Sequence, residues 1–418
     1  MSTDRPRVLI LGGGFAGVGA AQKLEDADAE VVLVDRHDYH TFQPLLYQLA
    51  TGLLETTAVG HSLRDLLERQ ENTSVHKGTV SAVDLDAREV RFEELSPLTY
   101  DYLVLALGAE VNFFGTPGAQ EHAFPMYTLP NAVRLKDHLL ERWEAAERDP
   151  SLVEDGALTI VIVGGGPTGV ETAGAVAELY RADFARDYPS LPQVEARVIL
   201  VEGGPELFSM FKPKLREYTA NALADRTVEV RTGAMVASVS PTRVTLKSGE
   251  ELKAHTLVWG AGLQGNRLVK ALGLELQRGN RIGVGRDLAI SDHPEVYALG
   301  DIAAIVDEKT QQVLPQLGSV ALQSGEHAGE TIARRIAGKE AKPFKYRDKG
   351  TMAAIGRRAA VVQMLGGRTM TGTKAQLAWA TVHLALLPTN EDRAKAVVDW
   401  AGATFAHQRA GRITVESE

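Results

Sequence analysis

The chain has 418 residues, 44% of them apolar and 24% charged, so its composition is that of a globular protein and excludes a disordered, fibrous or collagen-like chain. Its 45 Lys and Arg against 54 Asp and Glu give a net charge of −9, which argues against general nucleic-acid binding. Cysteine is absent, which excludes disulfides, thiolate nucleophiles, Cys-based zinc sites and iron–sulfur ligation.

The first predicted element is an apolar strand at residues 8–11, which leads directly into a G-x-G-x-x-G loop at 12–17. A helix-compatible stretch follows at 18–24, and the next strand, at 31–35, ends in an acid. Together these are the full dinucleotide-binding fingerprint. The glycines allow a tight turn and a close approach to a pyrophosphate, the helix N-terminus offers unpaired N–H groups, and the acid accepts hydrogen bonds from ribose hydroxyls.

The same pattern returns 152 residues later. A strand at 160–163 leads into a second glycine loop at 164–169, a helix is predicted at 170–179, and a strand at 198–202 again ends in an acid. Two complete fingerprints in one chain predict two bound dinucleotides. The 11 His and the acids show no spacing typical of a metal site.

Three further strands close on glycine, at 102–108, 256–262 and 297–301, and they indicate a first domain interrupted by a second. The fold class is therefore predicted as α/β, with two Rossmann-like dinucleotide-binding domains, the second inserted in the first, and a C-terminal α+β region with amphipathic helices. The expected boundaries are 1–118 and 271–335 for the first domain, 119–270 for the inserted domain and 336–418 for the C-terminal region.

The C-terminal region differs from the body in charge. Residues 336–418 hold 13 Lys and Arg and 7 Asp and Glu, whereas the first 335 residues hold 32 and 47. This asymmetry favours either contact with an anionic membrane surface or pairing of the tail with the body. Strands are predicted at 352–356 and 359–362, and helices at 377–387 and 394–405.

These motifs resemble the two-dinucleotide-binding flavoproteins and, within them, the type II NADH:quinone oxidoreductases. The resemblance runs nearly from end to end. Beyond the glycine loops, it is carried by Tyr39-His40-Thr41-Phe42-Gln43-Pro44-Leu45-Leu46-Tyr47-Gln48, Ala298-Leu299-Gly300-Asp301, Trp259-Gly260-Ala261-Gly262 and Gly350-Thr351-Met352-Ala353-Ala354-Ile355-Gly356.

The resemblance implies that the first loop binds FAD and the second binds NADH. Asp35 would hold the adenosine ribose of FAD, and Asp301 would contact its flavin side. A carboxylate at Glu202 favours NADH, since it accepts from a 2′-hydroxyl and repels a 2′-phosphate, although Arg231 could reach in. The candidate cofactor-binding residues are Gly12, Gly14, Phe15, Ala16, Gly17, Asp35, Arg36, Gly108, Gly300 and Asp301, with Gly164, Gly166, Gly169, Glu202 and Gly262.

The implied reaction passes a hydride from NADH to FAD and then two electrons to a quinone, menaquinone or ubiquinone. Without cysteine, a disulfide relay or a sulfide:quinone reductase of the usual type is excluded. The candidate catalytic residues are Glu171 and Gln323. Glu171 lies just after the second loop, in the first turn of the following helix. The alternative to a catalytic role is an acid that only complements the helix dipole. Gln323 matches the family's Ala-Gln-x-Ala-x-Gln pattern, in which Gly318-Ser319 replaces the expected Ala-Gln.

Attachment to the inner face of the cell membrane from the cytoplasm is also implied, since no signal peptide or spanning run is visible and relatives end in amphipathic helices. Trp379, His383 and Trp400 match that ending, whereas residues 387–392 bring a proline and two acids. Packing on the body or a homodimer interface is the alternative. The helix faces and basic residues expected to meet lipid are Leu377, Ala380, Leu384, Leu387, Val397, Trp400, Ala401, Phe405, Arg393, Lys395, Arg409 and Arg412.

Two other functions remain open at this point. One is a soluble FAD-dependent NAD(P)H reductase with a non-quinone or specialised acceptor, which the departures at Ser319 and in the tail favour. The other is a non-catalytic nucleotide-sensing protein, against which the two intact fingerprints argue.

Overall fold

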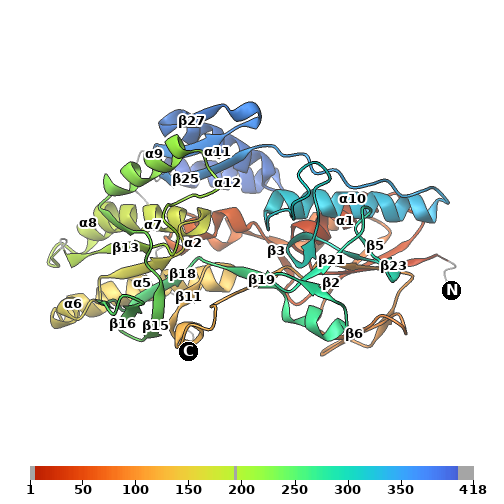
Figure 1. The fold of residues 1–418 in the computed structure, drawn as a ribbon, viewed down its shortest axis with the longest axis horizontal. Coiled ribbons are helices and arrows are strands. Elements are labelled where there is room, and N and C mark those ends of the chain that lie inside the picture. Colours follow the sequence, from red (N-terminus) through yellow and green to blue (C-terminus); the bar gives the residue numbers. More distant parts are fainter. Residues whose placement is uncertain (1–4, 193–194, 403–418) are drawn as a thin grey trace. The chain divides into compact units, whose positions relative to one another are not determined.

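The computed structural model describes residues 5–192 and 195–402. Its contacts divide the chain into two compact units. Unit 1 comprises residues 1–41, 60–110 and 263–347, and unit 2 comprises residues 42–59, 111–262 and 348–418. Each unit is built on one mainly parallel sheet, with an antiparallel edge strand in unit 1, and Figure 1 labels the elements.

The sheet of unit 1 has six strands in the order β22-β23-β9-β1-β2-β5. Valine, leucine and isoleucine fill its central strands, which are buried on both faces, as a covered parallel sheet requires. The strand order reverses between β1 and β9, and ligands of such sheets bind at the carboxyl ends of the strands at this switch point. The bounds are β1 (Arg7–Leu11), β2 (Glu30–Asp35), β5 (Thr73–Lys77), β9 (Tyr102–Leu105), β22 (Ala289–Ile290) and β23 (His293–Ala298).

Two helices of unit 1, α1 (Phe15–Lys23) and α10 (Gly318–Ile336), lie against each other (Figure 1). Small residues allow this close packing. A Cβ added to Gly325 would lie 2.1 Å from the carbonyl oxygen of Ala16, and one added to Gly329 would lie 2.5 Å from that of Ala20. The spacing of the small residues therefore determines how α10 covers the helix that follows the first glycine loop.

As far as it is described, the rest of unit 1 consists of small antiparallel or mixed sheets, one short α-helix and the 3₁₀ turns Arg267–Leu272 and Gly300–Ile302. These elements are β3 (Tyr39–Thr41), β4 (Gly60–Ser62), α3 (Leu63–Leu67), β6 (Val80–Asp84), β7 (Glu89–Phe92), β8 (Leu98–Thr99), β20 (Leu276–Gln277), β21 (Arg281–Gly283) and β24 (Ala303–Ala304). β10 (Ala109–Val111) pairs with β19 (Leu263–Gly265).

Unit 2 repeats the plan with a five-stranded sheet in the order β11-β18-β12-β13-β14. β12 again leads into a glycine loop and a helix, and all of its neighbouring pairs are parallel. The bounds are β11 (Phe124–Pro125), β12 (Ile160–Val163), β13 (Val198–Val201), β14 (Val228–Arg231), β18 (Thr256–Trp259), α4 (Ala119–His122), α5 (Leu129–Arg148), α6 (Ser151–Glu154), α7 (Pro167–Glu178), α8 (Ala185–Asp187) and α9 (Pro213–Ala224).

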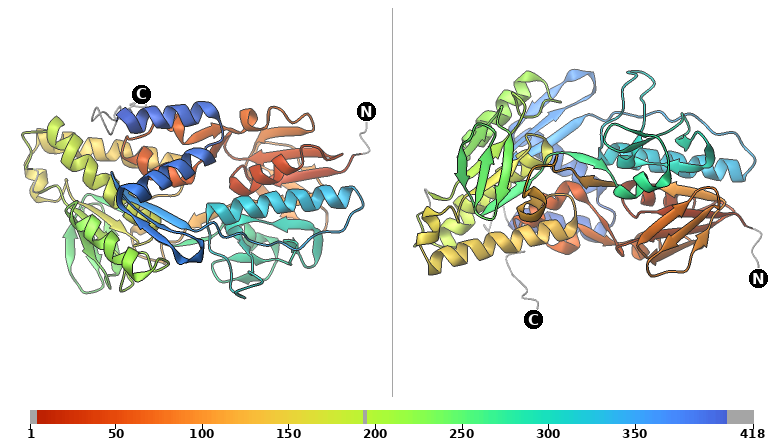
Figure 2. Two further views of the ribbon diagram at one scale, coloured as in Figure 1. Left: turned by 90° about the horizontal axis from the view of Figure 1, so that it is seen from above. Right: turned by 60° about the horizontal axis from the view of Figure 1, so that its bottom comes forward.

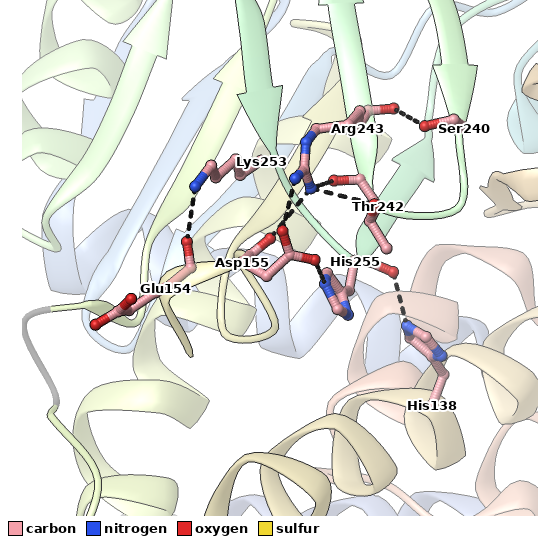
Figure 3. Close-up of polar contacts among 8 residues, drawn as sticks. All are labelled: His138, Glu154, Asp155, Ser240, Thr242, Arg243, Lys253 and His255. Atoms are coloured by element: carbon pink, nitrogen blue, oxygen red, sulfur yellow. Dashed lines mark hydrogen bonds and ion pairs between the residues drawn. The ribbon is translucent and has the colours of Figure 1, made fainter. Parts of the chain in front are cut away.

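A hairpin sheet of β15 (Val236–Ser240), β16 (Arg243–Leu246) and β17 (Glu251–Lys253) joins this core through a polar cluster (Figure 3). Asp155 accepts from Arg243 Nη2 at 2.6 Å and pairs with His255 Nε2 at 3.0 Å. The hydrogen bond from Arg243, and next that from His255, lower the pKa of the Asp155 carboxyl to about 2. The cluster fastens the hairpin sheet to the segment that precedes β12.

The described part of the C-terminal region belongs mostly to unit 2. Its sheet packs on α7, where a Cβ added to Gly174 would lie 1.7 Å from the carbonyl oxygen of Ile355. Figure 2 shows the two dark-blue C-terminal helices that follow this sheet. The elements are β25 (Thr351–Gly356), β26 (Ala359–Gln363), β27 (Thr369–Thr371), α11 (Gly372–Leu386) and α12 (Asn390–Ala401).

The compact units divide the chain differently from the expected domains. Residues 42–59 contain α2 (Leu46–Ala50), which packs on α5 and α7 and so lies in unit 2. Residues 336–347 stay with unit 1, since they follow α10 directly, whereas β25 binds residues 348–402 to unit 2. The strands predicted at 352–356 and 359–362 are confirmed.

The proline and acids of residues 387–392 end α11 and begin α12. Thr389 and Asp392 form a capping box, with the Thr389 hydroxyl bonded to the carboxylate at 2.6 Å. Leu387 is fully buried, so the exposed apolar residues of the two helices differ in part from those expected. Phe405, Arg409 and Arg412 lie outside the described residues.

Candidate functional site: two dinucleotide loops and a buried glutamate

The two glycine loops share one backbone geometry, each within its own unit. Gly12 and Gly164 have φ values of 110° and 114°, which side chains rarely adopt. A Cβ on Gly17 would lie 1.8 Å from the Gly12 carbonyl oxygen, and one on Gly169 would lie 1.8 Å from that of Gly164. These glycines are therefore required by the turn itself.

The middle glycines, Gly14 and Gly166, have a different role. Each caps its helix without a side-chain hydrogen bond to the first N–H groups. An added Cβ would meet no atom within 4 Å at either position, so the space beside each loop is open. Open space beside a helix N-terminus fits a pyrophosphate, and both loops pass this test for a dinucleotide.

The two acids that follow the next strands are bonded to these loops. Asp35 accepts from the Gly13 N–H at 2.6 Å, and Glu202 accepts from the Gly165 N–H at 2.5 Å. The second oxygen of Glu202 accepts from Gly204 N at 2.6 Å. Each carboxylate is thus held beside its glycine loop by backbone N–H groups.

Arg231 is the basic residue that could have received the 2′-phosphate of NADPH. Its guanidinium pairs with Glu229 at 2.5 Å and with Glu250 at 2.6 Å. Both carboxylates hold this side chain, which leaves it no free charge for a 2′-phosphate. The geometry therefore favours the unphosphorylated ribose of NADH.

The other predicted cofactor-binding residues lie around the loops of their own units. In unit 1, Phe15 packs edge-on against His40, Ala16 contacts α10, and Arg36 is exposed just after β2. Gly108 and Gly300 have positive φ, and the Asp301 carbonyl accepts from Gln316. In unit 2, a Cβ on Gly262 would meet the Phe114 ring at 2.3 Å.

His40 is a scaffold residue of the first loop. Its Nδ1 bonds to the Gly13 carbonyl at 2.9 Å, and burial lowers its pKa to about 4. The ring is therefore neutral at physiological pH, and Nδ1–H donates to the carbonyl.

Glu171 lies in the first turns of α7 in unit 2 and is partly buried. Its Oε1 accepts from the Ala354 N–H of β25 at 3.0 Å. Burial raises the pKa of the carboxyl from its ordinary 4.5 to about 8, although the bond from Ala354 and the Trp379 indole oppose the shift. The group therefore carries a proton at neutral pH, which sets it apart from an acid that only complements the helix dipole.

Aromatic residues from α2, α11 and α12 gather near this carboxyl. Tyr47 and Trp379 rings lie 6.5 Å apart, and Trp379 stacks on His383 at 4.2 Å. Trp400 Nε1 donates to Gln48 Oε1 at 2.7 Å, and Gln48 Nε2 donates to the Tyr47 hydroxyl at 2.9 Å. This chain of bonds attaches the last described helix to the element beside Glu171.

Sequence reasoning singled out Glu171, Trp379 and Trp400 but assigned no role to Tyr47 or Gln48. Both stand in the 39–48 segment that carries the family resemblance, so that segment was the available signal. Burial, and then the charge of Glu171, raise the pKa of the Tyr47 phenol, which therefore stays protonated. Two neutral hydroxyl donors, the phenol and the protonated carboxyl, thus lie in one apolar surrounding.

Gln323 lies on α10 in unit 1, whereas Glu171 belongs to unit 2. The Gln323 amide bonds twice to the backbone of Arg347. Its Nε2 donates to the Arg347 carbonyl at 3.1 Å, and its Oε1 accepts from the Arg347 N–H at 3.0 Å. One turn earlier, Ser319 bonds to the Tyr346 hydroxyl at 2.9 Å. Both α10 side chains therefore hold the segment that follows the helix.

Comparison with known proteins agrees with this geometry. Residues 6–325 match the family described as pyridine nucleotide-disulphide oxidoreductase. The chain is 34% identical to the type II NADH:quinone oxidoreductase Ndh of Mycobacterium tuberculosis, over 99% of this chain and 91% of that protein. It is 29% identical to the type II NADH:quinone oxidoreductase of Staphylococcus haemolyticus, over 90% of this chain and 93% of the relative.

The fold is similar to that of solved structures. NDH2 from Plasmodium falciparum in complex with NADH matches with a TM-score of 0.91 at 19% identity, covering 99% of this chain and 100% of that one. The sulfide:quinone oxidoreductase from Aquifex aeolicus matches with a TM-score of 0.74 at 17% identity, covering 98% and 96%. The duplicated loops, the absence of cysteine and the full-length identity lead to one assignment. The chain belongs to the pyridine nucleotide-disulphide oxidoreductase family and, within it, to the type II NADH:quinone oxidoreductases.

Proposed function

We propose that this chain converts NADH, one proton and a quinone into NAD⁺ and the quinol, and that the quinone is menaquinone or ubiquinone. Bound FAD supplies the chemistry that accepts a hydride and passes on two electrons. The observation that carries the proposal is the pair of equivalent loops, each with open space beside a helix N-terminus and with a tethered acid. The names of the full-length relatives support the pairing of NADH with a quinone.

The residues of unit 1 are assigned to FAD. Gly12, Gly14 and Gly17 admit the pyrophosphate to the N-terminus of α1, and Asp35 receives the adenosine ribose. Asp301 lies on the 3₁₀ turn directly after β23, at the carboxyl edge of the same sheet, and is assigned to the flavin side.

The second loop is assigned to NADH. Gly164, Gly166 and Gly169 admit its pyrophosphate to the N-terminus of α7, and Glu202 receives the ribose 2′-hydroxyl. Discrimination against NADPH follows from the carboxylate at Glu202 and from the ion pairs that hold Arg231 away.

Glu171 is proposed as the proton donor to the quinone. Quinone reduction consumes two protons, and a carboxyl with a pKa of about 8 can give one at neutral pH. For Gln323 we propose a positioning role, because both ends of its amide hold the backbone of Arg347.

Attachment to the inner face of the cell membrane is proposed through α11 and α12. Leu377 and Val398 are 68% and 67% exposed, and Val382, Leu386 and Val397 are exposed beside them in sequence. Such helices lie in the interface of a bilayer rather than crossing it. Within the described residues, no helix has the length and hydropathy that a membrane crossing requires.

Anaerobic stopped-flow on the FAD-loaded protein tests the function. NADH should bleach the flavin absorbance quickly, NADPH slowly, and a menaquinone or ubiquinone analogue should restore it. Bleaching by NADH without recovery by either quinone would contradict the quinone assignment and favour a reductase for another acceptor. No bleaching would contradict the enzyme assignment and favour a nucleotide-binding protein.

Vesicle co-sedimentation tests the membrane surface. The L377S/V398S variant should bind vesicles of anionic lipid at least tenfold more weakly than the wild type. The control V306S/V313S removes two apolar side chains that are exposed on unit 1 and should bind normally. If L377S/V398S instead binds vesicles normally and turns a dimer into a monomer in sedimentation velocity, the face belongs to a homodimer and the membrane proposal is wrong.

A further inference from the structure

The segment after α10 carries a concentration of positive charge on an acidic protein. Residues 339–347, called here the basic strap, contain Lys339, Lys342, Lys345 and Arg347 against one acid, Glu340. The strap has no helix or strand and returns along α10 within unit 1 (Figure 1). The proposed reaction uses none of these cations.

The strap is held in place despite its irregular backbone. His327 on α10 bonds to the Lys342 carbonyl at 3.0 Å, and the strap residue Phe344 is buried in the core of unit 1. The bonds of Gln323 and Ser319 described above hold its last two residues. A segment held at four points, through both backbone and side chains, presents its other side chains without a large ordering cost on binding.

A pocket of about 250 Å³ lies between α10 and the strap. Its lining includes four cations and one acid, together with His327. Burial lowers the pKa of His327, so its ring is neutral at physiological pH and adds no charge. The cations are Arg334, Lys342, Lys345 and Arg347, and the acid is Glu330.

The lining cations form no ion pair among the described residues. Within residues 5–192 and 195–402, Lys342, Lys345 and Arg347 form no ion pair, and Arg334 donates only to the carbonyl oxygen of Glu340 at 2.9 Å. The one acid of the lining, Glu330, lies 3.6 Å from Lys23 and so has a cation of its own. Four like charges around one hollow repel one another, and an anion placed among them removes that repulsion.

The chemistry and size of the pocket define its ligand. Guanidinium and ammonium groups are the usual protein partners of phosphate oxygens. The volume is below that of pockets for drug-sized molecules, and it fits a phosphate with a few attached atoms. We propose that this pocket binds a phosphate group, either free or as the headgroup of an anionic lipid.

Titration calorimetry with inorganic phosphate tests the proposal on the FAD-loaded enzyme. Saturating NAD⁺ is included so that both dinucleotide loops are filled. The pocket variant is K342A/K345A, and the matched control is K339A/K349A, which removes the same charge from neighbouring positions outside the lining. Saturable binding to the wild type should weaken at least tenfold in the pocket variant and less than twofold in the control.

Absence of saturable binding to the wild type would overturn the proposal, as would equal weakening in both variants. Thermal unfolding of the two variants checks that each is folded. Vesicles of phosphatidylglycerol then distinguish the sources of the phosphate. If the pocket variant loses vesicle binding more than the control does, and free phosphate competes, the ligand is a headgroup. If vesicle binding falls equally in both, the ligand is a free phosphate compound.

Discussion

Replacing Glu171 with Gln tests whether its proton takes part in quinone reduction. The side chain keeps its size and can still accept from the Ala354 N–H, but it cannot release a proton. With a pKa of about 8, the wild-type carboxyl is about 90% protonated at pH 7 and loses its proton as the pH rises through 8. General acids of this kind contribute about 10²- to 10⁴-fold to a rate.

We therefore expect E171Q to slow reoxidation of the reduced flavin by quinone about 100-fold or more, measured by stopped-flow. Flavin reduction by NADH should stay within about threefold, since it needs no proton from this group. The wild-type reoxidation rate should fall above pH 8, and that of E171Q should be flat. The control E217Q changes an exposed acid on α9 and should behave as the wild type.

The same pKa predicts a pH-dependent stability. Between pH 4.5 and 8 the folded carboxyl holds a proton that the unfolded chain has released, so the free energy of unfolding falls as the pH rises through this window. The loss amounts to about 3 kcal/mol at pH 7. Urea unfolding at pH 5, 7 and 9 should show this decline in the wild type and not in E171Q. If the free energy of unfolding declines equally in the wild type and in E171Q, and E171Q reoxidises its flavin at the normal rate, then both the raised pKa and the proposed role of Glu171 are wrong.

Three further predictions address the loops and the fold. In steady-state assays, E202A should lower kcat/KM for NADH about tenfold and leave that for NADPH unchanged or higher, because a partly buried carboxylate partner of the ribose is lost. A uniform fall for both nucleotides would contradict this prediction. G166A should fold normally and bind NADH more weakly, as measured by fluorescence titration. By contrast, G174A should lose more than about 2 kcal/mol of its free energy of unfolding in urea, because the added Cβ would overlap a carbonyl oxygen of β25. D155N should melt at a lower temperature near pH 7. Because the folded pKa of Asp155 is lowered from 3.8 to about 2, the wild type should lose this contribution as the pH falls from 4 to 2, and equal melting of the two proteins at pH 6 would contradict it.

The sequence by itself determined the two dinucleotide loops and their acids. These are local features, because the positive φ at Gly12 and Gly164 and the close approach of the following turn demand glycine within six residues. The strands and helices around the loops follow from runs of apolar residues, which also depend only on near neighbours. The absence of cysteine excluded a disulfide relay with no structure at all.

The tertiary structure decided what depends on residues far apart in the chain. The ion pairs that hold Arg231 to Glu229 and Glu250 appear only in the folded chain, and no local pattern encodes the second of these contacts. The raised pKa of Glu171 arises from burial beside β25 and α11, about 180 residues and more further along the chain. The pocket beside the basic strap likewise exists only because buried contacts return that segment onto α10. Burial and long-range pairing are properties of the packed fold, and for that reason the chemical state of each side chain became readable only there.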